Sequence, residues 1–195
     1  MVFSRSQTSS DFSLRLFQEF LCSVQKVRRD GLVSFGSTLE EFNIPLCVFS
    51  AGIGDIIEII FQQTFGHVPS NLHIISNFME YDETGTVCGF RPPLLHSFNK
   101  CTAAIDTNSK FFDDLQNRPN VILLGDMLGD VQMDRGLVYE ECILRIGFLN
   151  EQIEKSFSQF LDTYDLVLVD DQTFNVPNII LKALLGFRHR DGFSR

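Results

Sequence analysis

The sequence predicts an α/β protein in which a parallel β-sheet carries helices on both faces. Short apolar runs alternate with amphipathic stretches along most of the chain, and this alternation is typical of parallel sheets. One run, Val121 to Gly125, contains only apolar residues and glycine, as a strand buried on both faces requires. The chain has 195 residues, of which 44% are hydrophobic, so it is long enough to enclose one sizeable core.

The amino-terminal part is predicted to be helical. Apolar residues recur at helical spacing from Phe12 to Val27, with Ser10 or Asp11 as the cap, and Asp30-Gly31 breaks the pattern. A second helix is expected at residues 34–42, where Asn43 follows its end.

Strands and helices alternate from Pro45 onward. The first strand is expected at residues 45–49, because Pro-Leu-Cys-Val-Phe is a short apolar run followed by small, turn-forming residues. Residues 82–85, Asp-Glu-Thr-Gly, favour a hairpin turn between two short strands. The other expected strands are residues 72–76, 121–125, 143–147 and 166–169, and the other expected helices are 55–64, 109–117, 150–162 and 174–185.

Composition and charge exclude several classes of function. The net charge is −9 and no block of Lys and Arg occurs, which argues against a nucleic-acid polymer or an anionic membrane as partner. The five cysteines include no Cys-x-x-Cys pair, which argues against zinc and favours a reducing compartment. No apolar run approaches a membrane-spanning length, and the first ten residues lack the apolar core of a secretory signal. We therefore expect a cytoplasmic monomer.

The first segment with candidate chemistry is Ser50-Ala51-Gly52-Ile53-Gly54, which leaves an expected strand and opens an expected helix. Small residues let backbone N–H groups approach an anion, the helix N-terminus adds partial positive charge, and the Ser50 hydroxyl can donate a hydrogen bond. Asp55 is expected to cap the helix. The segment therefore predicts a phosphate site, and the alternative is an ordinary glycine-containing turn.

The second segment is Gly-Asp-Met-Leu-Gly-Asp at residues 125–130, directly after an expected buried strand. Ligands of open α/β sheets lie at the carboxyl ends of such strands. Two carboxylates there, Asp126 and Asp130, favour a hard cation such as Mg²⁺ held beside a phosphate. The alternative is a solvated acidic turn.

The third candidate is a single lysine, Lys100, which precedes an expected loop. It is either a cation for the phosphate or an ordinary surface residue, as most lysines are. The histidines show no ligand spacing and are expected to be structural or surface residues: His67, His73, His96 and His189.

The order of these three segments along the chain resembles that of the motifs in a known class of phosphatases. A Ser/Gly cradle, a lysine and Gly-Asp-x-x-Gly-Asp match the later three motifs of haloacid-dehalogenase-type phosphatases. Six segments resemble the cytosolic pyrimidine 5′-nucleotidase family, also called cytosolic 5′-nucleotidase III, and the similarity covers roughly Arg29 to Leu185. The segments are Ile44-Pro45 with Val48–Asp55, Ser76–Met79, Phe98–Lys100, Ile122–Asp126, Ile146–Asn150 and Tyr164–Val169.

The resemblance implies a fold, an activity and residue roles. The fold is a Rossmann-like haloacid-dehalogenase core, and the activity is Mg²⁺-dependent hydrolysis of nucleoside 5′-monophosphates, of the pyrimidine or 7-methylguanosine class, to nucleoside and phosphate. Lys100 would neutralise phosphate charge and steady the nucleophile, Asp126 would ligate Mg²⁺, and Asp130 would orient water or Lys100. The residues that would hold the phosphate are Ser50, Ala51 and Gly52.

Two parts of the family pattern are missing from the sequence. One is the first motif, a strand ending in Asp-x-Asp-x-Thr that supplies the nucleophile and the general acid–base, and the other is the helical cap inserted after it. The nearest acidic stretches are Asp11-Phe12-Ser13, Asp113-Asp114 and Asp170-Asp171, and none has the motif's residues and context. We therefore expect an incomplete core in which the remaining strands close up or the amino-terminal segment fills the gap, because each buried unpaired backbone group costs about 1–3 kcal/mol.

The expected organisation has three parts: a helical segment unlike the family at residues 1–28, a partial nucleotidase core at 29–186 and a tail at 187–195. This pattern fits a truncated or alternatively spliced nucleotidase, which alone would hydrolyse little. The alternatives are a non-catalytic module that binds phosphate, a nucleotide or a complete relative, and a chain without a stable fold. A NAD-dependent dehydrogenase is disfavoured, because Gly52-Ile53-Gly54 lacks the third glycine of that fingerprint.

Overall fold

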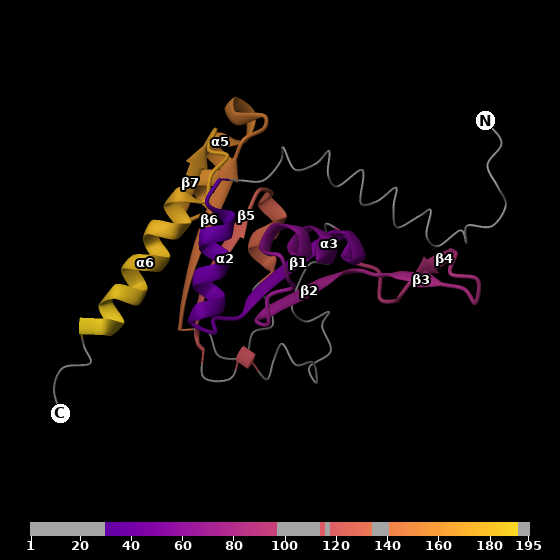
Figure 1. Cartoon of the computed structure of the whole chain (residues 1–195). Coiled ribbons are helices and arrows are strands. Elements are labelled where there is room, and N and C mark those ends of the chain that lie inside the picture. Colours follow the sequence, from indigo (N-terminus) through magenta and orange to yellow (C-terminus); the bar gives the residue numbers. More distant parts are fainter. Residues whose placement is uncertain (1–29, 97–113, 116–117, 134–140, 191–195) are drawn as a thin grey trace, which may run out of the picture.

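The computed structural model describes residues 30–96, 114–115, 118–133 and 141–190, with side chains up to residue 186. Its helices are α2 (Leu32–Glu41), α3 (Gly54–Phe65), α5 (Ile153–Thr163) and α6 (Asn175–Arg190), together with a short 3-10 helix, η3 (Leu128–Gln132). Its strands are β1 (Leu46–Ile53), β2 (Leu72–Asn77), β3 (Met79–Tyr81), β4 (Val87–Phe90), β5 (Asn120–Gly125), β6 (Cys142–Leu149) and β7 (Leu166–Val169). Figure 1 shows α2 and α6 beside the strands and the β3–β4 hairpin projecting away from them.

The α/β class with parallel pairing is confirmed. Strands β5, β6 and β7 form a parallel sheet in that order, and β1 pairs in parallel with β2. The antiparallel β3–β4 hairpin closes through the predicted turn, where the Asp82 carboxylate accepts hydrogen bonds from the N–H groups of Thr84 and Thr86. Within the described residues, the parallel strands are therefore divided between two sheets instead of forming one.

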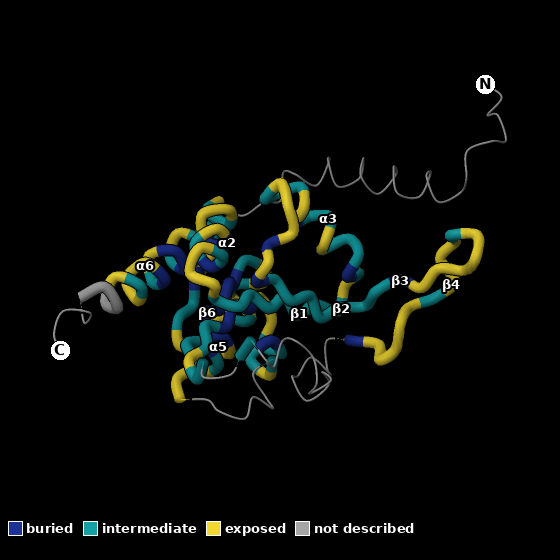
Figure 2. The backbone as a smooth tube through the Cα atoms, turned by 60° about the horizontal axis from the view of Figure 1, so that its bottom comes forward, coloured by how far each residue is buried: buried dark blue, intermediate teal, exposed yellow. Residues whose placement is uncertain are grey.

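Helices cover both faces of the three-stranded sheet, as predicted. On one face, Phe160 of α5 belongs to a buried cluster with Leu149 of β6. On the other face, α6 packs against a cluster that contains Ile146 and Phe148, also of β6. Successive strand residues point to opposite faces, so β6 supplies both clusters. Because Ile146 is 0% exposed, β6 lies at the centre of the core (Figure 2).

One apolar cluster joins the two parallel sheets. Phe35 and Leu39 of α2 pack with Leu181 of α6, and Leu46 of β1 and Leu124 of β5 pack against them. The helical spacing of the apolar residues in α2 explains this contact, because they share one face of the helix. The two sheets therefore share a core without sharing a hydrogen-bonded ladder.

The edges of β1 and β5 that lie away from β2 and β6 have no strand partner among the described residues. At the amino ends of these strands, the Arg118 guanidinium donates a 2.9 Å hydrogen bond to the carbonyl of Asn43. In this part of the chain, the expected closing-up of the remaining strands does not occur. The other expectation, that the amino-terminal segment fills the gap, concerns residues outside the described ranges.

Several expected boundaries shift. The strand expected to end at Phe49 continues to Ile53, and the helix expected at 174–185 continues to Arg190. Residues 114–115 are helical, but the rest of the helix expected at 109–117 and the whole of the one at 12–27 lie outside the described residues.

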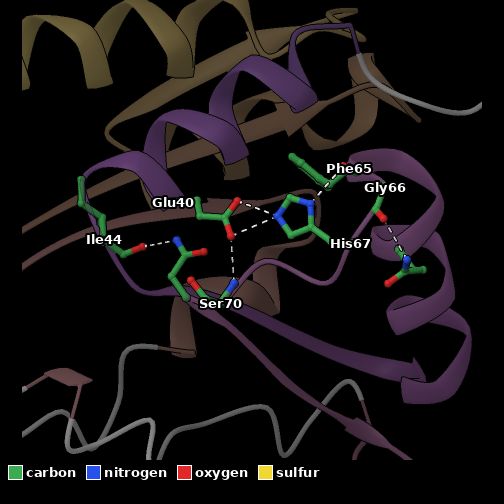
Figure 3. A network of polar contacts seen from close by, with 8 residues as sticks. Glu40, Ile44, Phe65, Gly66, His67 and Ser70 are labelled. Atoms are coloured by element: carbon green, nitrogen blue, oxygen red, sulfur yellow. Dashed lines mark hydrogen bonds and ion pairs between the residues drawn. The ribbon is translucent and has the colours of Figure 1, made fainter.

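The end of α2 is tied to the loop between α3 and β2 (Figure 3). The Glu40 carboxylate accepts the Ser70 N–H at 3.0 Å and lies 2.9 Å from Nε2 of His67. These two contacts, the Ser70 N–H first, lower the pKa of Glu40. Nε2 of His73 lies 3.0 Å from Asp114. The histidines were predicted to be structural or surface residues, and His67 and His73 both contact carboxylates.

Candidate functional site

The predicted phosphate cradle lies in a bulge of β1. The ladder pairs Phe49 with Ile75 and next pairs Ile53 with Asn77, so three residues of β1, Ser50 to Gly52, face one residue of β2. Bulges of this kind bend a strand and redirect its side chains. The expected turn is thus an irregular end of the strand itself, at the sheet's carboxyl edge.

Hydrogen bonds within the bulge fix its shape. The Gly52 N–H donates to Oγ of Ser50 at 3.0 Å, and Oγ of Ser76 on β2 donates to the Gly52 carbonyl at 2.9 Å. Oγ of Ser50 therefore acts as an acceptor, and no acceptor for its own hydrogen occurs among the described residues. That hydrogen is available to an anion at the carboxyl edge of the sheet.

The helix that follows the bulge begins differently from the prediction. Ile53, with no side-chain hydrogen bond, is the N-cap of α3, and Asp55 lies in the first turn. The Asp55 carboxylate accepts the N–H of Met79 at 2.8 Å and so ties α3 to the start of the hairpin. Asp55 is therefore a link between elements and not the helix cap.

Asn77, at the end of β2, holds the bulge against the segment after the hairpin. Its Nδ2 donates to the carbonyls of Ala51 and Leu95 at 2.9 and 3.0 Å, and its Oδ1 accepts the Leu95 N–H at 2.8 Å. Sequence reasoning gave Asn77 no role, although it lies in a segment that carries the family resemblance. Because one amide makes all three bonds, Asn77 fixes the distance between the bulge at Ala51 and the segment at Leu95.

The two carboxylates after β5 have different environments. Asp126 is exposed, whereas Asp130 is 5% exposed and its Oδ2 accepts the N–H groups of Asp126 and Met127, both at 3.1 Å. Asp130 therefore shapes the loop through backbone contacts, and Asp126 is the carboxylate that the loop presents at the sheet edge. Whether Asp130 also orients water or Lys100 stays a prediction.

Tyr164 supports this loop from the other side. Its hydroxyl donates to the carbonyl of Met127, and burial, with the charges of Asp130 and Asp126 adding to it, raises the pKa of Tyr164. A Cβ at Gly125 would lie 2.5 Å from the Tyr164 oxygen and 2.7 Å from Cβ of Asp130. Glycine at 125 thus allows the strand end, the tyrosine and the buried carboxylate to pack together.

The prediction that Asp126 ligates Mg²⁺ can be compared with the acids around it. Within the described ranges, no group of three His, Cys, Asp or Glu side chains gathers to hold a metal. Mg²⁺ in phosphate sites commonly uses one or two carboxylates and completes its shell with phosphate and water. The exposed Asp126 fits one such position. Ser50 and Asp126 lie at the carboxyl ends of strands in the two parallel sheets, and Lys100 lies outside the described residues.

The model of the pyrimidine 5′-nucleotidase family (UMPH-1) matches residues 9–185. The chain belongs to this family. The matched range begins well before Arg29, where the similarity was expected to start. The fold of this chain is haloacid-dehalogenase-like. A phosphoserine phosphohydrolase-like protein from Francisella tularensis shares that fold, with a TM-score of 0.50 at 17% identity.

Relatives within the nucleotidase family are substantially longer. The 7-methylguanosine phosphate-specific 5′-nucleotidases of Mus musculus and Homo sapiens are 45% identical over 157 residues, which is 80% of this chain and 52% of theirs. The putative cytosolic 5′-nucleotidase 3 of Caenorhabditis elegans is 40% identical over 89% of this chain and 46% of its own. The crystal structure of cytosolic 5′-nucleotidase IIIB bound to cytidine has a TM-score of 0.76 at 34% identity, over 83% of this chain and 53% of that chain. The chain thus spans about half the length of the curated relatives it matches.

No helix in the described part of the chain is long and apolar enough to cross a membrane.

Proposed function

We propose that this chain holds the phosphate of a nucleoside 5′-monophosphate in a 5′-nucleotidase site, and that these 195 residues alone hydrolyse it little. The observation that carries the proposal is the bulge of β1, in which the Ser50 hydroxyl hydrogen has no described acceptor at the carboxyl edge of the sheet. Family membership supports the substrate class, because named relatives are nucleotidases of 7-methylguanosine phosphate.

Each residue of the proposed site has a different role toward the phosphate. Ser50 would donate its hydroxyl hydrogen, and the small side chains of Ala51 and Gly52 would let an anion approach the backbone. Lys100 adds a positive charge. Asp126 would be one ligand of Mg²⁺, which when bound would neutralise charge on the phosphate oxygens.

The proposal of low activity rests on the missing Asp-x-Asp-x-Thr motif, and the contacts of several acids near the carboxyl edge support it. Hydrolysis breaks the bond between phosphorus and the 5′ oxygen, which needs a nucleophile in line with that bond and a donor for the leaving oxygen. Asp130 and Asp55 both accept backbone N–H groups, and Asp171 accepts hydrogen bonds from Thr173. Asp126 is proposed as the metal ligand, and the sequence holds no Asp-x-Asp-x-Thr to supply the nucleophile and the general acid–base of the family pattern.

A non-catalytic role is the second candidate, and the same geometry favours it. Phosphate binding needs the bulge, a cation and Asp126, but it needs no nucleophile. In this form the chain would bind phosphate or nucleotide, or would associate with a complete relative through the strand edges of β1 and β5.

The test combines turnover with binding. Purified chain is mixed with Mg²⁺ and CMP, UMP or 7-methyl-GMP, and phosphate release is followed. Calorimetry then measures inorganic phosphate binding with and without Mg²⁺. We expect negligible release and Mg²⁺-dependent binding that weakens about tenfold or more in Ser50→Ala, because a hydrogen bond to a charged group is lost.

Two results would contradict the proposal. Steady phosphate release that disappears in Asp126→Asn would show that the chain is a complete enzyme. Ser34, on the exposed side of α2, serves as the control position. If phosphate does not bind, or if Ser34→Ala weakens binding as much as Ser50→Ala, the bulge is not a phosphate site.

A further inference from the structure

The imidazole ring of His67, in the loop after α3, lies between two hydrogen-bond acceptors, Phe65 and Glu40 (Figure 3). Its Nδ1 lies 3.2 Å from the carbonyl oxygen of Phe65, the last residue of α3. Its Nε2 lies 3.1 and 2.9 Å from the two carboxylate oxygens of Glu40, near the end of α2. A neutral imidazole carries one N–H and can donate to only one of these groups, whereas the imidazolium donates to both. The arrangement therefore fits the doubly protonated ring.

The described groups that face the ring all suit a positive charge. From α2 the group is Glu40, whose carboxylate also accepts the Ser70 N–H at 3.0 Å. From α3 it is the C-terminus of the helix, where the last carbonyls carry partial negative charge and a histidine can bind them. The Ser70 N–H, and after it His67, lower the pKa of Glu40, so this carboxylate stays ionised where histidines titrate. The side chain of His67 is 56% exposed, so water also solvates the charged ring.

These contacts lie where two strands begin. Nδ2 of Asn71, which follows Ser70, donates to the carbonyl of Ile44 at 2.6 Å, and the N–H of Leu46 donates to the Asn71 carbonyl at 2.9 Å. Leu46 opens β1, and Leu72 opens β2. The ring therefore joins the ends of α2 and α3 to the amino ends of β1 and β2, whereas the bulge of β1 lies toward the carboxyl end.

We propose that His67 is a pH-sensitive clasp between α2, α3 and the loop that precedes β2. In its imidazolium form the ring holds Phe65 and Glu40 together, and loss of one proton leaves one of these two contacts without a donor. Histidine changes its charge between about pH 5 and pH 8, so the clasp responds within the physiological range. The inference does not depend on phosphate binding.

The Ser70 amide is the reporter, because it donates to the same carboxylate as the ring. NMR measures its hydrogen–deuterium exchange in the full chain at about pH 5.5 and about pH 8.5, and division by the intrinsic exchange rate at each pH gives the protection factor. We expect the protection factor to be about two- to fivefold higher at the lower pH, as the strength of an exposed ion pair implies. The ring nitrogen signals of His67, followed over the same range, show where the second proton leaves.

Three variants assign the effect to this pair of side chains. His67→Gln and Glu40→Gln should each remove the pH dependence of Ser70 protection. Glu41→Gln changes an exposed carboxylate at the neighbouring position, so it is the matched control and should keep the pH dependence. His73, whose Nε2 lies 3.0 Å from Asp114, is present in all three variants, so an effect of that second histidine would persist in each of them.

Several results would overturn the clasp. One is a protection factor for Ser70 that stays constant while the ring loses its proton. Another is a pH dependence that persists in His67→Gln or in Glu40→Gln, because the ring or its carboxylate partner would then not be responsible. Loss of the pH dependence in Glu41→Gln would indicate a general charge effect in place of a specific contact. His67, Glu40 and Glu41 are all partly or fully exposed, so the variants should fold.

Discussion

Asn77 offers the sharpest test of how the carboxyl edge is held together. Its side-chain amide makes three hydrogen bonds of 2.8 to 3.0 Å to Ala51 and Leu95. A typical intramolecular hydrogen bond contributes about 0.5–1.5 kcal/mol, so Asn77→Ala should lower the free energy of unfolding by about 2–4 kcal/mol. For a chain of this size, that corresponds to a fall in melting temperature of about 5–12 °C.

A second variant separates the hydrogen bonds that the Asn77 side chain donates from the one that it accepts. Asn77→Asp keeps an acceptor for the Leu95 N–H but removes both donations and places a carboxylate against two carbonyl oxygens. We expect it to be at least as destabilising as Asn77→Ala. Both variants should also bind inorganic phosphate more weakly than the wild type at a temperature where they remain folded, because the bulge would lose its fixed position.

The matched control is Asn178 of α6, a buried amide that donates to the carbonyls of Gly31 and Phe174, both at 2.9 Å. Asn178→Ala should cost about 1–3 kcal/mol by the same reasoning and leave phosphate binding unchanged. Urea unfolding and calorimetry on the three variants make the comparison. The reasoning is refuted if Asn77→Ala is less destabilising than Asn178→Ala, or if the two variants bind phosphate equally well.

Three further outcomes follow from the structure. Gly125→Ala should destabilise the fold by about 1–3 kcal/mol in urea unfolding, because its Cβ would overlap the Tyr164 oxygen, whereas Gly186→Ala, which meets nothing within 4 Å, should be neutral or slightly stabilising. The pKa of Tyr164 is raised above its ordinary 10, so the stabilisation from its neutral form is complete below pH 10 and is lost as the pH rises further. The free energy of unfolding should therefore fall as the pH rises to about 11.5, and it should fall less in Tyr164→Phe. Burial raises the pKa of Cys47 to about 12, so a thiol reagent at pH 8 should modify the exposed Cys88 and Cys142 before Cys47. Equal rates at Cys47 and Cys88 would contradict the burial.

The sequence predicted the regular elements well because their signals are local. The apolar run before Gly125 and the helical spacing of Phe35 and Leu39 reflect burial on one strand or one helix face, and the structure confirms both. Most strand limits are also close to their expected positions. The alternation of elements was sufficient to predict parallel pairing, because it reflects connections that parallel strands require.

The site was less predictable because its geometry depends on contacts between distant segments. The spacing of Asp126 and Asp130 could not show that one carboxylate turns inward to two backbone N–H groups while the other stays exposed. Glycine at 125 serves close packing against Tyr164, 39 positions away in a chain of 195 residues, and no local pattern could show that contact. The bulge at Ser50 depends on pairing with β2, which no local pattern encodes.

The separation of the two parallel sheets has a consequence for local opening. Strand β6 has a ladder partner on each side, whereas β1, which carries β2, is joined to the other sheet through the packing of Leu46 and Leu124 under α2 and α6. Cooperative units joined only in this way can open one at a time, so backbone amides of β1 and β2 should exchange with deuterium well before those of β6. The bulge of β1 would then belong to the less protected unit, and if it holds phosphate as proposed, occupancy should slow exchange there while leaving β6 unaffected.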